Sequence, residues 1–295
     1  MKRIIFLVIF LIGICQLNEL QAQSSLAIGV RPQAMGGAYT ALSNDANAVF
    51  WNPAGLRMVR EGDARFMHWL FSDIDQVNIN SAVVAHPLPN QMGTIGVGWT
   101  RIGAELEEGP LNRRSTMSEN EIRLSYGVAV SPNLLIGATM NRTMLSSDVG
   151  SGAGLGFDIG VMVRPVRGVA WTVGFVGRNL VANMKNEALD PYYLLGMAYR
   201  LSTADRVHQF SIVGDVIARE DIDGQEGITP QFAGGLEYEL NFQQFRLALR
   251  GGGGSKNISF GGGLGYGTFS IEYAVVMMHE LTIGDSHRFG INLYF

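Results

Sequence analysis

The sequence predicts an all-β protein, a transmembrane antiparallel β-barrel of about 14 strands with a small N-terminal helical hatch in its lumen. Three observations lead to this prediction. The chain beyond Leu56 consists of short segments that alternate apolar residues with small or polar ones, a period typical of strands. Short connections between segments alternate with long ones, as in barrels that cross an outer membrane. The last segment ends in an aromatic residue, Phe295, which resembles the assembly signal of outer-membrane barrels.

The first residues have the features of a secretory signal peptide. A basic pair precedes an apolar run over residues 4–15, which is too short to cross a bilayer, and Ala22 suits cleavage. We therefore expect residues 1–22 to be removed. Cys15 is the only cysteine, and Ile14 before it disfavours lipidation, where a small residue is needed. The mature chain would then depend on hydrogen bonds and packing, without disulfides.

Composition excludes several classes of function. A formal net charge of −4 gives no basic footprint, so we expect no nucleic-acid partner. No apolar run long enough for a membrane helix follows the leader. The chain contains 38 glycines in 295 residues, about twice the average usage, and this excess needs a structural explanation.

The stretch ahead of the strands differs from the rest of the chain, and we assign residues 24–62 to the hatch. Small residues dominate it without strict alternation. Asp45 is placed to cap a turn that begins at Ala46, and Asn52-Pro53 has the pattern of a second cap. Gly36-Gly37 allows close approach to other backbone. On local physics alone, an ordinary pair of capped helices remains an equal alternative.

Residues 63–295 are assigned to the barrel. The first two candidate strands alternate poorly, so 12, 13 or 14 strands are possible, and an even count places both termini at the short-turn end. The candidate strands are 64–72, 76–87, 92–103, 118–130, 133–145, 152–164, 169–180, 191–202, 207–218, 229–240, 244–251, 257–265, 268–279 and 287–295.

A water-soluble β-sandwich is the alternative fold, because it also alternates. The polar face, however, carries many charges, which in a barrel point into the lumen. One register of the hairpin around residues 241–244 places Glu239 opposite Arg246 as a cross-strand ion pair. The charges assigned to the lumen in this region are Glu237, Glu239, Arg246 and Arg250. Together with the terminal aromatic residue, they favour the barrel.

No motif indicates catalysis, a cofactor or a metal. Gly150–Gly156 has a superficial likeness to a phosphate-binding loop, but no Lys-Ser/Thr follows, and glycines on the inner face of a strand explain it better. The five histidines lack metal-ligand spacing, and no serine has a nucleophile-elbow context. We therefore expect no enzyme. The charged stretch Glu105–Arg114 is interpreted as part of a long solvated loop, 104–117.

The stretch at residues 27–56 resembles the PorV/PorQ family, which is related to the FadL fatty-acid transporters whose hatch also carries Asn-Pro-Ala. The matching residues are Gly29, Arg31, Pro32, Ala34, Met35, Gly36, Gly37, Ala38, Ala41, Leu42, Asp45, Ala46, Asn47, Ala48, Trp51, Asn52, Pro53, Ala54, Gly55 and Leu56. The resemblance implies a fourteen-stranded barrel in the bacterial outer membrane with an N-terminal hatch. It also implies a hatch motif of Arg31, Met35, Gly36, Gly37, Asp45, Asn52, Pro53 and Ala54.

The resemblance leaves two functions open. PorV-like proteins serve type IX secretion, which predicts protein partners from the secretion system in addition to outer-membrane lipid. FadL-like proteins pass hydrophobic small molecules through hatch and wall, which is the alternative. The apolar hatch residues Tyr39, Leu42, Phe50 and Trp51 are candidates for a ligand path, although packing against the barrel wall is the favoured explanation for them. Family resemblance favours the secretion role by a narrow margin.

Overall fold

The computed structural model describes residues 28–72, 76–108, 113–148, 150–164, 170–184, 187–220, 228–255, 257–278 and 285–295. The expected signal peptide and Cys15 lie outside the described residues, as do His279 and residues 109–112 of the expected long loop. Within the described part of the chain, no helix is long and apolar enough to cross a bilayer.

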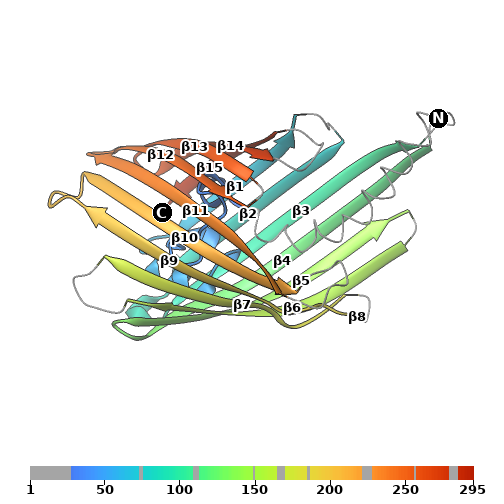
Figure 1. The fold of residues 1–295 in the computed structure, drawn as a ribbon, viewed down its shortest axis with the longest axis horizontal. Coiled ribbons are helices and arrows are strands. Elements are labelled where there is room, and N and C mark those ends of the chain that lie inside the picture. The colour runs from blue at the N-terminus through green and yellow to red at the C-terminus, as the bar shows by residue number, and fades with distance from the viewer. Residues whose placement is uncertain are drawn as a thin grey trace.

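The described strands form one closed antiparallel barrel, as Figure 1 shows. The long strands pair in sequence order, and β1 closes the barrel on β15. The two-residue β8 (Glu187–Ala188) extends the end of β7. The fourteen barrel strands are β1 (Asp63–Phe71), β2 (Val77–Pro87), β3 (Thr94–Glu108), β4 (Arg113–Ser131), β5 (Leu134–Ser147), β6 (Gly150–Val163), β7 (Trp171–Met184), β9 (Tyr192–Ser202), β10 (His208–Glu220), β11 (Ile228–Phe242), β12 (Phe245–Gly254), β13 (Asn257–Tyr266), β14 (Phe269–Met278) and β15 (Ser286–Tyr294). The predicted fold class is confirmed.

The alternation along each strand separates an outer apolar face from a polar lumen. In β15, Phe289 is 49% exposed on the outside, whereas Arg288 is 1% exposed on the inside. The same contrast separates Leu236 from Glu237 in β11 and Phe157 from Asp158 in β6. Outward apolar side chains suit a lipid surface. The inward charges are buried, so another part of the chain must cover them inside the lumen.

The expected long loop at residues 104–117 is wrong, because most of it belongs to strands. The ladder between β3 and β4 continues from Ala104 and Met117 to the pair Glu108 and Arg113. Charged residues are depleted in average strands, so this composition favoured a loop. A strand that extends beyond the apolar band needs no apolar face, so the polar sequence does not interrupt the ladder.

The expected pairing of Glu239 with Arg246 is also wrong. Phe242 faces Phe245 across a two-residue turn, so Arg246 faces Asn241 and Glu239 faces Ala248. Turn length fixes the register of a hairpin, and the shorter turn places both aromatic side chains on the outer face. The same register places Glu237 opposite Arg250.

The segment from Ile28 to Gly62 lies inside the barrel (Figure 1). It contains α2 (Val30–Ala34) and two short 3₁₀ helices, η1 (Ala46–Val49) and η2 (Pro53–Met58). A third, η3 (Pro89–Gln91), lies in the turn between β2 and β3. Both predicted caps are confirmed: the Asp45 carboxylate accepts a hydrogen bond from the Asn47 amide at 2.9 Å, and the Asn52 side-chain oxygen accepts one from Ala54 at 3.1 Å. We call residues 28–62 the hatch.

Glycines on the inner wall explain why the hatch fits. A Cβ on Gly235 would lie 2.5 Å from the Met35 carbonyl oxygen, and one on Gly252 would overlap the Met35–Gly36 backbone. Gly36 itself adopts φ 71°, which glycine tolerates best. Other inner glycines where a Cβ would come within 3 Å of the hatch are Gly96, Gly98, Gly127, Gly137, Gly160, Gly174, Gly196, Gly261 and Gly290. The high glycine content therefore allows the wall to approach the hatch backbone.

We predict that Gly235→Ala combined with Gly252→Ala prevents the hatch from seating. The two methyl groups would overpack the Met35–Gly36 backbone at a cost of roughly 1–3 kcal/mol each. Single-channel recordings of the refolded protein should then show frequent open events that the parent lacks. Gly214→Ala is the matched control, because the nearest atom to its Cβ is 3.8 Å away. Equal conductance in all three proteins would contradict this account.

Candidate functional site

Arg31 of the hatch is the centre of a buried ion-pair network. Its Nε and Nη2 atoms donate to the two carboxylate oxygens of Glu237 on β11, at 2.7 and 2.6 Å. Its Nη1 donates to Asp45 at 3.0 Å and to Tyr39 at 2.9 Å. The Glu237 side chain is fully buried. A planar guanidinium matches a carboxylate in this two-bond geometry, so the contact fixes both position and orientation.

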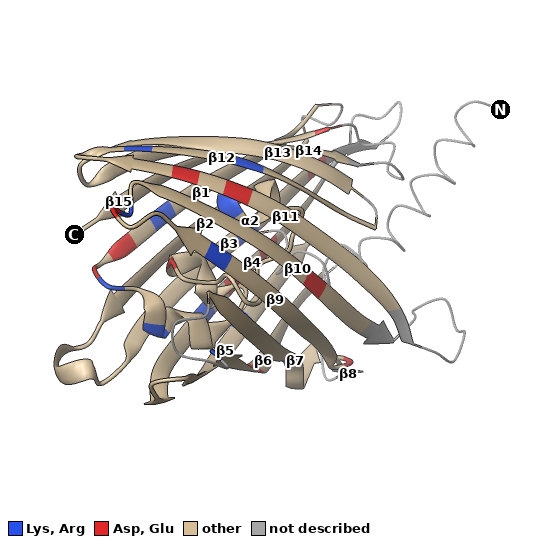
Figure 2. Ribbon diagram, turned by 60° about the vertical axis from the view of Figure 1, so that its left-hand side comes forward, with Lys and Arg blue, Asp and Glu red and all other residues tan. Residues whose placement is uncertain are grey.

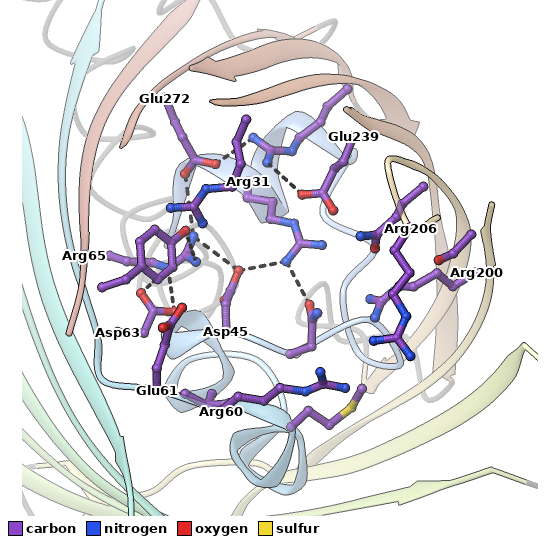
Figure 3. A pocket seen from close by; sticks show the side chains of 18 residues that line it. Arg31, Asp45, Arg60, Glu61, Asp63, Arg65, Arg200, Arg206, Glu239 and Glu272 are labelled. Carbon is purple, nitrogen blue, oxygen red and sulfur yellow. Dashed lines mark hydrogen bonds and ion pairs between the residues drawn. The ribbon is translucent and has the colours of Figure 1, made fainter. Parts of the chain in front are cut away.

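Further ion pairs extend this network into a closed ring, parts of which Figure 3 shows. Arg250 on β12 joins Glu237 to Glu272 on β14, with both N–O distances at 2.8 Å. Arg65 on β1 joins Glu272, at 3.7 Å, to Asp45, at 3.3 Å. The ring therefore alternates in charge through Arg31, Glu237, Arg250, Glu272, Arg65 and Asp45. Each member has two opposite neighbours, which offsets the cost of burying its charge. We call these six residues the ion-pair ring.

The hatch groups of the ring remain charged. Burial alone would lower the pKa of the Arg31 guanidinium, but Glu237, together with Tyr39 and Glu239, raises it above its usual value. Burial would raise the pKa of the Asp45 carboxyl, yet Arg65, Arg31 and the Tyr39 hydroxyl hold it below its usual value. Burial raises the pKa of Tyr39, which stays neutral and donates to Asp45 at 2.6 Å.

A second anchor holds the hatch from the wall formed by β6 and β7. Arg178 on β7 donates to the backbone carbonyls of Phe50 and Trp51, the latter at 2.8 Å. Its other terminal nitrogen donates to Asp158 on β6, which also accepts from Arg123 on β4. Arg178 is 1% exposed. The two carbonyls at the end of η1 are thereby held by a charged donor.

A third anchor comes from β10. One carboxylate oxygen of Asp215 accepts from the backbone amides of Tyr39 and Thr40, both at 2.8 Å. The Asn52 side chain donates to the Thr40 carbonyl at 2.8 Å and to Val161 of β6 at 3.3 Å. Hatch backbone is therefore held from several sides of the barrel.

The structure brings most of the predicted hatch residues together. Arg31 and Asp45 belong to the ion-pair ring, whereas Met35, Gly36 and Gly37 belong to the segment seated on β11–β13. Pro53 lies against Gly137 of β5. Ala54 is fully buried in a small cluster with Leu135 of β5 and Met162 of β6.

The four residues of the suggested ligand path, Tyr39, Leu42, Phe50 and Trp51, are at most 2% exposed within one apolar cluster shared with the wall. The Tyr39 and Trp51 rings meet edge to face at 5.9 Å. This packing accounts for their positions, and a part in ligand passage stays a prediction.

Figure 2 shows that charged residues are spread over many strands of the barrel. The charges predicted in the lumen divide into two groups. Glu237 and Arg250 belong to the ion-pair ring, whereas Glu239 lies 4.0 Å from Arg250. Arg246 stacks on the Tyr294 ring at 4.1 Å and donates to the Gly267 carbonyl. Sequence reasoning missed Arg65 and Arg178. Arg178 lies two residues after the inward Val176, so strict alternation along β7 would have found it.

A cavity of about 540 Å³ lies beyond the ion-pair ring, at the short-turn end of the barrel (Figure 3). Its wall includes Arg60 and Glu61 at the end of the hatch, Arg206 in the turn after β9, and Tyr294 near the C-terminus. We call this cavity the vestibule. The described residues include no group of three or more His, Cys, Asp or Glu side chains that could hold a metal ion.

Comparison with known proteins gives structural likeness only. No protein-family model and no curated protein sequence matches the chain. The toluene transporter TbuX of Ralstonia pickettii superposes with a TM-score of 0.63 at 12% identity, covering 91% of this chain and 98% of the other. The P. putida toluene transporter TodX gives 0.61 at 11% identity, with the same coverage of both chains. A FadL homologue of Pseudomonas aeruginosa gives 0.55 at 10% identity, covering 90% and 98%. At these identities the likeness establishes the fold.

The lowered pKa of Asp45 predicts that acid loosens the hatch. In the seated hatch the carboxylate is favoured over its protonated form, so its contribution is complete above about pH 4, the usual value for a free aspartate. The contribution is lost as the pH falls through the lower seated value. Single-channel recordings should show more open events towards pH 3.

Asp45→Asn preserves the capping oxygen but removes the charge. It should therefore open more often than the parent at pH 7 and respond less to acid. Asp190→Asn, at an exposed position, is the control. Identical pH profiles for the parent and Asp45→Asn would show that Asp45 does not hold the hatch.

Proposed function

We propose that the chain is an outer-membrane transporter of hydrophobic small molecules. The fold likeness to toluene transporters supports this proposal, because it extends over nine-tenths of the chain and nearly all of each neighbour. The observation that carries it is that the hatch fills the lumen and blocks passage along the barrel axis. Side chains from several strands of the wall hold the hatch there. A barrel closed in this way is unsuited to be an open pore for polar solutes.

The part of the lumen between the hatch and the short-turn end is also unfavourable for an apolar molecule. The ion-pair ring and the charged vestibule lie between the hatch and the short-turn end. An apolar solute would gain nothing from such a lining and would displace water from charged groups. We therefore place its exit through the barrel wall.

The seam between β6 and β7 is the position in the wall that suits such an exit. Phe157 pairs with Val181 and Ile159 with Gly177, so three residues of β7 stand opposite one of β6. Such a bulge interrupts the ladder. Asn179 adopts φ 52°, and its amide donates to the Asp158 side chain instead of to backbone. Side chains therefore hold the wall together here, and less backbone hydrogen bonding has to break for it to open.

A disulfide across this seam tests the proposal. Phe157→Cys and Val181→Cys occupy directly paired, outward positions, within reach of a disulfide. Intact cells expressing the chain should take up radiolabelled toluene faster than cells without it. The oxidised seam variant should lose most of this gain, and a reductant should restore it.

The control disulfide joins Leu201→Cys to Phe210→Cys, a pair in the regular ladder of β9 and β10 that also faces outward. It should leave uptake unchanged. Uptake that is insensitive to the seam disulfide would refute the lateral route. Uptake that never exceeds the background of empty cells would refute the transport function itself.

A type IX secretion role of PorV/PorQ type is the second candidate. It is motivated by the hatch motif within residues 27–56, and no comparison supports it. Under that role the barrel would bind protein partners from the secretion system and take up no hydrophobic solute. Absent toluene uptake, together with co-purification of secretion proteins, would favour it.

A further inference from the structure

We propose that the vestibule binds a small organic monoanion, with its carboxylate on Arg200 and Arg206. The vestibule volume of about 540 Å³ falls in the range of small-molecule sites. The proposal does not rest on transport, because the vestibule lies on the opposite side of the ion-pair ring from the packed hatch core and binds its ligand from the short-turn end.

The arginines that line the vestibule fall into two classes. Arg31, Arg65 and Arg250 belong to the ion-pair ring, and each has at least two carboxylate partners. Four others line the same cavity without any ion pair among the described residues: Arg60, Arg200, Arg206 and Arg246. Arg246 is occupied by its stacking on Tyr294 and its bond to Gly267. Arg200 and Arg206 have no carboxylate within ion-pair distance among the described residues, although Glu237 and Glu239 attract Arg200 from farther away. Their guanidinium donors are therefore available to a ligand.

Arg200 and Arg206 reach the cavity from one wall. Arg200 is on β9, two residues before the strand ends, and Arg206 is in the turn that follows. Figure 3 shows both side chains directed into the cavity from the wall across from Asp63 and Glu61. The turn is itself ordered, because the Arg206 amide donates to the Thr203 carbonyl at 2.9 Å and the Asp205 side chain accepts from the Val207 amide at 3.0 Å. Arg206 has φ 59°, a conformation that a non-glycine residue adopts at some cost.

The charge balance indicates a single negative charge on the ligand. Seven arginines and five carboxylates line the cavity, and buried Glu237 behind Arg31 and Arg250 is a sixth carboxylate. One positive charge is left over. A monocarboxylate would neutralise it, whereas a phosphate dianion would exceed it. The planar fork of an arginine suits a carboxylate, and Met58 and Val59 provide the cavity with apolar surface for a short organic group.

Isothermal titration of the refolded full chain in nonionic detergent tests this site with three probes of the same shape. Benzoate is anionic, benzyl alcohol neutral and benzylamine cationic at pH 7.5. We expect saturable benzoate binding that weakens as salt rises, and at least about tenfold weaker binding of the other two. Inorganic phosphate should compete poorly.

Arg200→Gln and Arg206→Gln should each weaken benzoate binding about tenfold, because each removes a charged donor. Arg206→Gly should weaken it equally while relieving the positive φ, which separates loss of the side chain from damage to the turn. Arg142→Gln, at an exposed position on β5, is the matched control and should bind as the parent does.

Three results would overturn the proposal. The first is equal affinity for benzoate and benzyl alcohol, which would indicate apolar or micellar binding. The second is phosphate displacing benzoate as well as benzoate displaces itself, which would exclude the monoanion class. The third is unchanged binding in Arg200→Gln and Arg206→Gln, each shown to be folded by its heat-dependent gel mobility.

Discussion

The ion-pair ring is the constraint on which the rest of the structure depends. Four of its members come from strands β1, β11, β12 and β14, and the hatch supplies Arg31 and Asp45. Without the hatch the wall residues form an open chain of charges, with Glu237 and Arg65 at its ends each lacking one partner. Burial of charges that lack a partner is costly, whereas a complete ring gives every charge two neighbours. Such networks contribute position and specificity more than net stability, and here the position specified is that of the hatch.

The glycines of the wall make this position accessible. Arg31 reaches Glu237 only if α2 lies close to the strands. The absence of a Cβ at Gly235 and Gly252 allows the hatch backbone to approach the wall this closely. The anchors from Arg178 and Asp215 then hold the hatch at other parts of the wall. A lumen filled in this way separates two environments. Hatch and wall residues together form an apolar cluster, whereas a charged vestibule opens at the short-turn end.

Much of the fold could be predicted because the alternation of side chains is local. The period of two predicted most of the barrel strands, although β1 and β2 alternate poorly, and residue type and spacing predicted the caps at Asp45 and Asn52. The register of β11 and β12 could not be predicted, because it depends on whether the turn contains two residues or more. Arg65 was missed because β1 alternates poorly, and the ring that it completes depends on ion pairs between distant residues, such as Arg31 and Glu237, which are 206 positions apart. Loops were overestimated where strands continue with polar residues beyond the apolar band.

Amide hydrogen exchange of the hatch would test most directly the claim that the hatch is clamped. The Tyr39 and Thr40 amides donate to the buried Asp215 carboxylate and belong to no strand ladder. If the anchors hold, both amides should exchange as slowly as the central amides of β10 and β11 in the folded barrel. Exchange at the rate of exposed turns, with the barrel ladder still protected, would show that the hatch moves independently of the wall and would contradict the account.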